Sequence, residues 1–458
     1  MGTILNSQQA GESLEVLIPS RKVPVLAETD VLVCGGGAAG VAAACSAARH
    51  GASVALIERW PFVGGMATAA LVNIWHRSDR EKMVIYGLVE EVTQRAQKRG
   101  WATQYPSFPR VHETHWFDPE GMKIVLQDML DEAKVRTFCY TAAGEPLVED
   151  GEIHGVLVHT KQGLRALRAS IVIDATGDGD LATNAGVPFD FGREGDGKVQ
   201  GMTMMYRVCG IDEAKVQSLP DEDKQRMMTE MRAASVAGEL PPYSPAFSLW
   251  HARNRCIPNM CPVAGNPLDE EELTRLTNES RRYVHAYWDW LRLRVPGLER
   301  VVIEQTGFSL GIRESRRIRG LKTLDKEMVL GAQKQPDALG HGIWMIDIHD
   351  PKGTGYTTWM DRNASNMVPE GQSYHIPLGI CLNEQIPNLA VVGRCASSTH
   401  EGHSSVRVQT HCMVMGQGVG TAAAMALESG KPMHAVNIES LRKKLRADGV
   451  YLEEVPES

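Results

Sequence analysis

The sequence predicts an α/β fold in which a Rossmann-like dinucleotide-binding domain, with a central parallel sheet and a β-meander, is interrupted by an inserted α+β domain. Three observations predict this fold. An apolar run at residues 30–34 ends in glycines and is followed by an Ala-rich stretch and a second apolar run at residues 53–58. Strand-like runs joined by turn residues fill residues 135–160. The apolar strand pattern returns at residues 388–392, after a middle section rich in Gly, Pro and Met, so the chain leaves this sheet and re-enters it.

The individual elements follow from local signals. Residues 38–50 favour a helix because Ala is the best helix former. Asp118 and Pro119 predict a helix start, since an N-cap residue is followed by proline at the first helical position. Asp150 and Gly151 predict a tight hairpin. We also expect helices at 87–99 and 269–294, a small-residue helix ending near 429, and strands at about 135–140, 145–149, 153–160 and 171–175.

These patterns divide the chain of 458 residues, which is long enough for two or three domains. Residues 1–24 are expected to form an N-terminal leader. The dinucleotide-binding domain is discontinuous and takes residues 25–186 and 376–435. A substrate or cap domain of residues 187–375 is inserted between them, and residues 436–458 form a C-terminal tail.

Composition excludes several classes of protein. The formal net charge of −8 lacks the basic excess of a nucleic-acid-binding surface, so no nucleic-acid partner is expected. The sequence contains no run of 18 apolar residues, so it predicts no membrane span. The first twenty residues do not resemble a secretory signal, and the expected location is therefore the cytoplasm. The nine cysteines are scattered, and no spacing predicts a metal site. Assembly into a homo-oligomer is left open.

The glycines after the first strand form a dinucleotide-binding motif. Gly35, Gly37 and Gly40 give G-x-G-x-x-G between a strand and a helix, which is the context that makes this otherwise weak motif specific. Gly35 permits the tight turn, Gly37 lets the backbone approach a pyrophosphate, and Gly40 lets helix and strand pack closely. Glu58 ends the second strand, where a carboxylate can bind ribose hydroxyls and disfavours a 2′-phosphate. The motif alone does not distinguish FAD from NAD.

Longer segments point to one of these dinucleotides. The sequence resembles the FAD-dependent oxidoreductase family related to the fumarate reductase and succinate dehydrogenase flavoproteins. The segments that carry the resemblance are VCGGGAAGVAAACSAARHGASVALIER, GGMAT, FDPEGMK, VIDATGDGDLATNAGV, LGIRESRRIRG, DIHDP, YHIPLG and NLAVVGRCASSTHEGHSSVRVQTHCMVMGQGVGTAAA. The resemblance implies FAD as the cofactor. It also implies noncovalent binding, because relatives with covalent flavin use a His shortly before the double glycine, and none lies between Glu58 and Gly64.

The resemblance also implies a set of cofactor-binding residues. For the adenosine and phosphate end it implies Gly35, Gly37, Ala39 and Gly40 at the pyrophosphate, Glu58 and Arg59 at the ribose, Cys139 on the strand that meets adenine, and Gly177 and Asp178 at the close of the ADP site. For the flavin end it implies Gly65, Met66 and Thr68 near flavin and phosphates, Gly393 and Arg394 at the ribityl chain, and Val406, Arg407 and Val408 where the last helix begins under the flavin pyrimidine.

Histidines supply the candidate catalytic groups, because imidazole transfers protons near neutral pH. His400 and His403 lie between Arg394 and the last helix, which by the resemblance places them near the flavin, either as catalytic groups or as hydrogen-bonding partners of flavin or backbone. His349 is the third candidate. Asp347 lies two residues before it, so a carboxylate on the same side of an extended segment could orient the ring. A two-residue metal motif is the alternative reading of that pair.

Three further residues are candidates for substrate contact. Arg313 can bind a carboxylate in bidentate fashion, although structural pairing with a nearby acid is the more common role of such a residue. His76, after the GGMAT loop, either lines the substrate face or packs in the core. Tyr374 is a weaker candidate.

The sequence therefore predicts an FAD-dependent dehydrogenase or oxidase that takes a hydride from a small organic substrate onto flavin N5. Because no second G-x-G-x-x-G appears, electrons are expected to leave to oxygen, a quinone or a protein carrier. Two alternatives remain at this point. One is a flavoprotein with non-redox or RNA-modifying chemistry, and the other is an NAD dehydrogenase.

Overall fold

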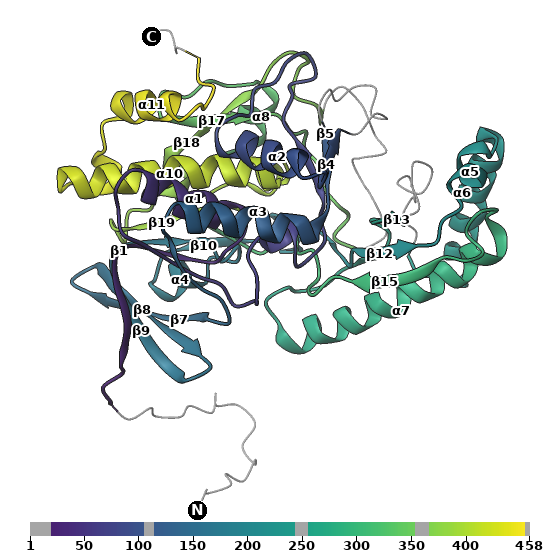
Figure 1. Ribbon diagram of the computed structural model, residues 1–458, viewed down its shortest axis with the longest axis horizontal. Coiled ribbons are helices and arrows are strands. Elements are labelled where there is room, and N and C mark those ends of the chain that lie inside the picture. Colours follow the sequence, from purple (N-terminus) through teal and green to yellow (C-terminus); the bar gives the residue numbers. More distant parts are fainter. Residues whose placement is uncertain (1–19, 105–113, 243–254, 353–365, 454–458) are drawn as a thin grey trace, which may run out of the picture.

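The computed structural model describes residues 20–104, 114–242, 255–352 and 366–453, and it has the expected α/β fold (Figure 1). In its largest sheet, strand β9 joins a parallel part to a meander, because β9 runs parallel to β1 and β19 and antiparallel to β8. The order of the strands is β6 (Arg136–Phe138), β2 (Val54–Ile57), β1 (Val25–Cys34), β9 (Gly163–Asp174), β8 (Glu152–Thr160) and β7 (Ala142–Glu149), and β19 (Leu389–Val391) pairs with β9. The pairing of β19 confirms that the chain re-enters the sheet.

The alternation of side chains along β1 divides the core of this domain into two layers. Val31 and Val33 pack in the core on the side of the long helices, while Leu32 and Cys34 pack on the side of the meander. All four side chains are fully buried. A strand buried on both faces needs an unbroken apolar run, which is why the residues from Val31 to Cys34 carry no polar side chain.

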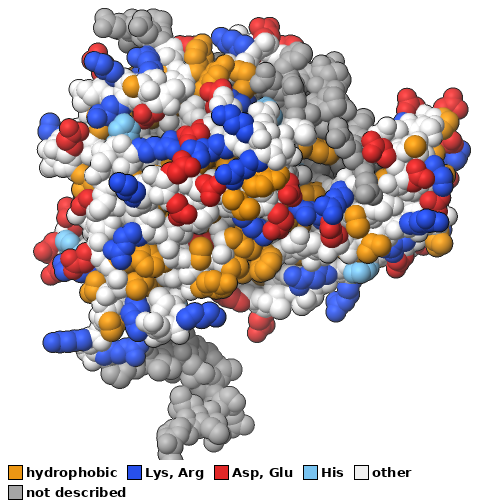
Figure 2. Space-filling model, in the orientation of Figure 1, with side chains coloured by type: hydrophobic (Ala, Val, Ile, Leu, Met, Phe, Trp, Pro, Cys, Tyr) orange, Lys and Arg blue, Asp and Glu red, His pale blue; other side chains and the backbone are white. Residues whose placement is uncertain are grey.

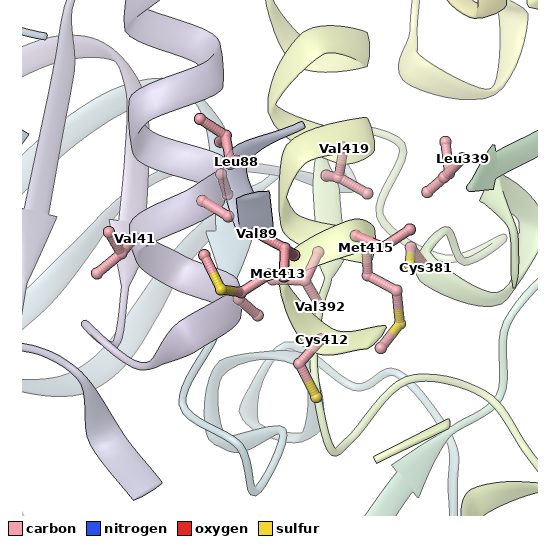
Figure 3. Close-up of a cluster of buried hydrophobic side chains, with 14 of the residues drawn as sticks. Val41, Leu88, Val89, Leu339, Cys381, Val392, Cys412, Met413, Met415 and Val419 are labelled. Carbon is pink, nitrogen blue, oxygen red and sulfur yellow. The ribbon is translucent and has the colours of Figure 1, made fainter. Parts of the chain in front are cut away.

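Two helices from opposite ends of the chain cover one face of the sheet side by side. They are α1 (Ala38–Arg49) and α10 (Gln409–Ser429). Glycines allow their close approach: a Cβ atom on Gly416 would lie 2.1 Å from the carbonyl oxygen of Ala39, and one on Gly420 would lie 2.3 Å from that of Ala43. Figure 3 shows the apolar side chains around this contact, with Val419 on α10.

Most local predictions agree with the structure. Helix α3 (Pro119–Glu132) begins after Asp118, whose carboxylate accepts hydrogen bonds from the first backbone amides. Asp150 and Gly151 both have positive φ, as a tight hairpin between β7 and β8 requires. Strands β1 and β9 are longer than expected because they continue to pair with each other before their apolar runs, from Val25 with Ala166 to Thr29 with Ala169. The small-residue stretch forms two helices, α9 (His400–Val406) and α10, because Val408 adopts an extended conformation between them.

The middle of the chain forms an arm with its own core (Figure 1). Helix α7 (Glu270–Arg294) runs along this arm, and Tyr287 and Trp288 in its second half pack with Met227 and Met231 of α6. The other elements of the arm are α5 (Glu213–Ser218), α6 (Asp221–Val236), β11 (Met202–Thr203), β12 (Tyr206–Cys209), β13 (Arg255–Cys256), β14 (Pro262–Val263) and β15 (Val302–Thr306).

The two cores suggest domain limits that differ from those expected. The core of the arm contains residues between Met202 and Ile312. Residues from Leu324 onward pack in the core of the dinucleotide-binding domain, and so do Leu441 and Leu445 of α11 (Ile438–Ala447). We therefore propose a cap domain of about residues 202–312, with the segment after it and the expected C-terminal tail both belonging to the dinucleotide-binding domain. The expected leader falls largely outside the described residues.

The remaining strands and α-helices of the described residues lie outside both the largest sheet and the arm. They are β3 (Ile74–His76), β4 (Ala102–Gln104) and β5 (Thr114–Phe117) in one sheet, the pairs β10 (Phe189–Phe191) with β16 (Arg316–Ile318) and β17 (Ala338–Gly342) with β18 (Tyr374–Pro377), and helices α2 (Leu88–Lys98), α4 (Asp180–Asn184) and α8 (Lys326–Leu330). None of the helices within the described ranges combines the length and apolar character needed to cross a bilayer.

Candidate active site

One large cavity lies between the carboxyl ends of the parallel strands and the cap. Its volume is about 1430 Å³. Cavities for a single small ligand usually measure about 300–1,000 Å³, so this one has room for a dinucleotide and a second molecule together. One end is lined by the glycine turn after β1, and the other by the first half of α7. We refer to these as the cofactor end and the cap end.

The three glycines of the motif have different neighbours. Gly35 has φ +109°, and a Cβ there would lie 2.3 Å from the carbonyl oxygen of Ala175. A Cβ on Gly40 would lie 1.8 Å from the carbonyl oxygen of Gly35. A Cβ on Gly37 would meet only the Cα of Gly65, at 3.9 Å, and Gly37 lines the cavity. Gly35 and Gly40 therefore serve the fold, whereas Gly37 leaves space for a ligand.

Two helix N-termini without side-chain caps meet this cavity. Gly37 is the N-cap of α1 and Val408 the N-cap of α10, and neither terminus is capped by a side chain. Their first backbone amides have no partner within the helix, and the helix dipole favours negative charge at this end. The Gly64–Gly65 loop lies against the turn, where the Gly64 amide donates to the Gly36 carbonyl at 2.7 Å. This cradle fits the pyrophosphate and flavin of a dinucleotide.

Glu58 is held rigidly beside the turn. Its carboxylate accepts hydrogen bonds from the amides of Gly36 (2.7 Å) and Trp60 (2.9 Å) and lines the cavity. Burial raises the pKa of this carboxyl, and the two amides partly oppose that rise. Its fixed position suits a carboxylate that binds a sugar hydroxyl.

Arg394 reaches the cavity from the end of β19. Its guanidinium donates to Asp178 Oδ1 and to Ser315 Oγ, both at 2.8 Å. Burial opposes ionisation of Asp178, but Arg394 and Ser315 outweigh burial and lower the pKa of its carboxyl. Asp178 therefore orients Arg394 from behind and does not itself line the cavity.

Most of the cofactor-binding residues expected from sequence line this cavity, and five do not. Those that line it are Gly35, Gly37, Ala39, Glu58, Arg59, Gly65, Met66, Gly177, Gly393, Arg394, Arg407 and Val408. Those that lie behind the lining are Gly40, Thr68, Cys139, Asp178 and Val406. Thr68 donates to the Val63 carbonyl at 2.9 Å and so shapes the glycine loop, and Thr141 and Ala142 line the cavity in place of the neighbouring Cys139.

Asp347 and His349 form a polar pair on the cavity wall. His349 Nε2 lies 3.5 Å from Asp347 Oδ1, and Arg407 donates to the Asp347 carbonyl at 3.1 Å. Burial, reinforced by the Arg313 guanidinium, lowers the pKa of His349 to about 4. Burial opposes ionisation of Asp347, but its contacts with His349 and Arg407 outweigh burial and lower its pKa. At neutral pH the site thus holds a neutral imidazole beside a carboxylate. No cluster of three metal-ligating side chains occurs in the described ranges.

Arg313 and His76 also line the cavity. Arg313 donates to the Gly201 carbonyl (2.7 Å) and to Thr203 Oγ1 (2.8 Å), so neutral acceptors fix its guanidinium. The His76 ring stacks on Trp344 with centroids 4.1 Å apart, and burial lowers the pKa of His76 to about 4.

The other three candidates lie behind the cavity wall. His400 Nδ1 is 2.9 Å from Glu314 Oε1, and His403 Nδ1 is 3.4 Å from Gln200 Nε2. Gln200 in turn accepts hydrogen bonds from the His349 amide (3.3 Å) and from Arg407 (3.4 Å), so His403 acts on the wall through Gln200. The Tyr374 hydroxyl contacts Ser405 Oγ at 2.8 Å in the core.

Residues from the cap were missed by the reasoning from sequence. Thr274, Asn278 and Arg281 of α7 line the cavity, as do Asn259 and Phe308. The first three occupy one face of a helix whose opposite face is apolar, which is a signal that could have identified them. The rest come from loops whose position depends on the assembled cap.

The sequence pattern of a family described as FAD dependent oxidoreductase matches residues 30–445. The chain belongs to this family. The dinucleotide of the cofactor end is therefore FAD and not NAD, and the protein is an FAD-dependent oxidoreductase. No curated protein matches the sequence significantly.

Several solved structures are similar at low sequence identity. A geranylgeranyl bacteriochlorophyll reductase-like protein from Thermoplasma acidophilum is 14% identical, with a TM-score of 0.45 over 92% of this chain and 83% of that one. The p-nitrophenol 4-monooxygenase PnpA from Pseudomonas putida is 10% identical, with a TM-score of 0.46 over 94% and 91%. The Mycobacterium smegmatis Sdh1 complex is 14% identical, with a TM-score of 0.41 over 92% and 72%.

Proposed function

We propose that the protein oxidises a small organic molecule, with His349 accepting a proton as a hydride passes to FAD. The observation that carries the proposal is that a single cavity joins the glycine turn at Gly37 to the Asp347–His349 pair. When bound, FAD supplies a hydride acceptor at N5. The substrate loses a hydride from carbon and a proton from the adjacent oxygen or nitrogen, so one C–H bond and one O–H or N–H bond break together.

The chain's own residues account for the proton. The Asp347 carboxylate, 3.5 Å from Nε2, orients the ring of His349 and favours positive charge on it as it accepts the proton. Because burial lowers its pKa to about 4, His349 is unprotonated at neutral pH but is a weak base, so we propose that it takes the proton only as the hydride leaves. The N-terminus of α10 can stabilise negative charge on the flavin ring by about 1 kcal/mol.

We further propose that the cofactor is held without a covalent bond. Residues 59–63 contain no histidine. Cys412 lines the cavity, but burial raises the pKa of its thiol to about 12, so it remains protonated and is a poor nucleophile. The segments that resemble fumarate reductase and succinate dehydrogenase flavoproteins support a closer relation to that group. As acceptor of the electrons we propose oxygen, a quinone or a protein carrier.

Anaerobic mixing of the flavin-loaded protein with a panel of small alcohols, amines and acids tests this function. A substrate should bleach the flavin absorbance, and His349→Gln should keep the flavin but slow bleaching by about 10²- to 10⁴-fold, the usual worth of a general base. His285→Gln, on the exposed side of α7, is the control and should bleach at the wild-type rate.

Two outcomes would count against the proposal. Wild-type bleaching in His349→Gln would remove His349 from the mechanism. Turnover without bleaching would favour non-redox chemistry. On the face seen in Figure 2, Lys and Arg side chains are interspersed with Asp and Glu, which gives an RNA substrate no support there.

A further inference from the structure

The first half of helix α7 has two faces with different functions. Leu276 and Val284 on one face are buried in the core of the cap. Thr274, Asn278 and Arg281 on another face line the cavity, at the spacing i, i+4 and i+7 that places them in one row. The helix therefore presents a ladder of hydrogen-bond donors, ending in a cation, to the cap end of the cavity.

Arg281 is the arginine of α7 that lines the cavity, and unlike Arg275 and Arg292 it has no acidic partner among the described residues. Arg275 pairs with Glu272 and Glu279, and Arg292 pairs with Asp289. Within the described ranges no carboxylate forms an ion pair with Arg281, although its side chain is half-buried. A guanidinium in a partly buried, concave position gains from an anionic partner, which it can bind through two parallel hydrogen bonds.

The charges around Arg281 favour an anion at the cap end. Arg313, just beyond the cap, adds a second guanidinium to the cavity wall, where it donates to Gly201 and Thr203 and also acts electrostatically on Asp347. Among the acids that line the cavity, Asp347 is paired with His349 and Arg407, Asp180 is paired with Arg316, and Glu58 is held by backbone amides. Glu370 is the remaining acid of the lining. A guanidinium that lines a recess raises the local concentration of anions, even in a chain of net charge −8.

We propose that the cap end of the cavity is a subsite for an anionic oxygen group, a carboxylate or a phosphate, at the remote end of an elongated substrate. Arg281 binds the anion, Thr274 and Asn278 donate neutral hydrogen bonds, and the other end of the molecule reacts beside His349. The volume of about 1430 Å³ accommodates such a molecule together with the cofactor. This inference rests on the proposed function, since it places the reacting end by His349.

The test is a binding titration of the flavin-loaded protein that needs no turnover. The probes are straight-chain carboxylates from butanoate to dodecanoate, the matching alkyl phosphates, and the alcohols of equal length. Binding is followed by perturbation of the flavin absorbance and by thermal shift. We expect the longer anions to bind more tightly than the alcohols, and Arg281→Ala to weaken anion binding about tenfold or more while alcohol binding is unchanged. The carboxylate and phosphate series show which anion the subsite prefers.

Arg282→Ala is the matched control, because Arg282 is the next residue, carries the same charge and is exposed outside the cavity lining. It should leave every binding constant unchanged, and Arg281→Lys should retain part of the anion affinity. Equal losses in the two alanine variants, or equal losses for anions and alcohols, would overturn the subsite. If anions bind through Arg281 but no compound of the alcohol, amine and acid panel bleaches the flavin, the proposed function fails while the subsite stands.

Discussion

The two ends of the cavity are built from different parts of the polypeptide. The cofactor end is mostly backbone: the turn at Gly37, the loop at Gly65, and the residues Gly177 and Gly393 that follow β9 and β19. The cap end is mostly side chains, which project from α7 and from the loops of the cap. A backbone site depends on the path of the chain and tolerates much change in sequence. A side-chain site changes with single substitutions, so one scaffold can hold the same cofactor while its substrate varies.

The largest expected effect separates two glycines three residues apart. Gly40→Ala should prevent stable folding, because its Cβ would lie 1.8 Å from the Gly35 carbonyl oxygen, and a backbone clash of this kind costs more than about 4 kcal/mol. Gly37→Ala should fold, because its nearest neighbour would be 3.9 Å away and its φ of −72° suits alanine. The new methyl group would nevertheless occupy ligand space, so Gly37→Ala should purify without flavin.

Thermal unfolding and flavin content per chain measure both effects. Gly51→Ala is a control for loss of a glycine elsewhere, because a Cβ there meets nothing within 4 Å, although its φ of +95° costs some stability. A Gly37→Ala protein that retained a full complement of flavin would show that the cofactor does not approach this turn.

A change of intermediate size is expected in the stability of the protein as pH falls. It arises from buried histidine side chains and not from the backbone of the cofactor end. Burial lowers the pKa of His76 and His349 to about 4 and that of His411 to about 3, from an ordinary value of 6.5. At pH values between the lowered pKa of each histidine and 6.5, the unfolded chain therefore binds more protons than the folded chain. The stability from these groups is fully present above about pH 6.5 and is lost as pH falls towards 4.

Each such histidine contributes on the order of a few kcal/mol over this range. Urea unfolding at a series of pH values should show the midpoint falling steadily below pH 6.5. His349→Gln and His76→Gln should flatten that fall. A midpoint that stayed level down to pH 4 would mean that these rings are already charged in the folded protein.

The sequence predicted the cofactor end better than the cap end for a physical reason. The turn at Gly35–Gly40 is local, since strand, glycines and helix follow each other directly. The position of His400 and His403 is not local. Both lie on the short helix α9, and their rings turn inward to Glu314 and Gln200, residues distant in the sequence. Because His400 and His403 follow Arg394 closely in the sequence, their backbone could be placed near the cofactor, but the direction of their side chains could not be predicted.

The Asp347–His349 pair shows the opposite case. Two residues at spacing i and i+2 were expected to face one side, and the structure brings their side chains to 3.5 Å on the cavity wall. Arg281 could have been identified from the polar row on α7, but its meeting with the same cavity depends on how the cap packs. Local geometry can thus be predicted from spacing, whereas the convergence of distant segments requires the assembled fold.

The smallest expected effect concerns Tyr374, which the sequence suggested as a substrate contact. Its hydroxyl contacts Ser405 Oγ at 2.8 Å, and Ser405 donates to the Trp344 carbonyl at 2.5 Å, so the pair fixes the segment that leads to Asp347 and His349. Tyr374→Phe should cost about 1 kcal/mol of stability, the usual worth of one buried hydrogen bond, and slow flavin reduction only a few-fold. Flavin content should not change, because this hydroxyl lies outside the cofactor end. If Tyr374→Phe instead slowed flavin reduction as much as His349→Gln while stability was unchanged, Tyr374 would contact the substrate. The cavity would then extend to a side chain that is buried in the core in this structure.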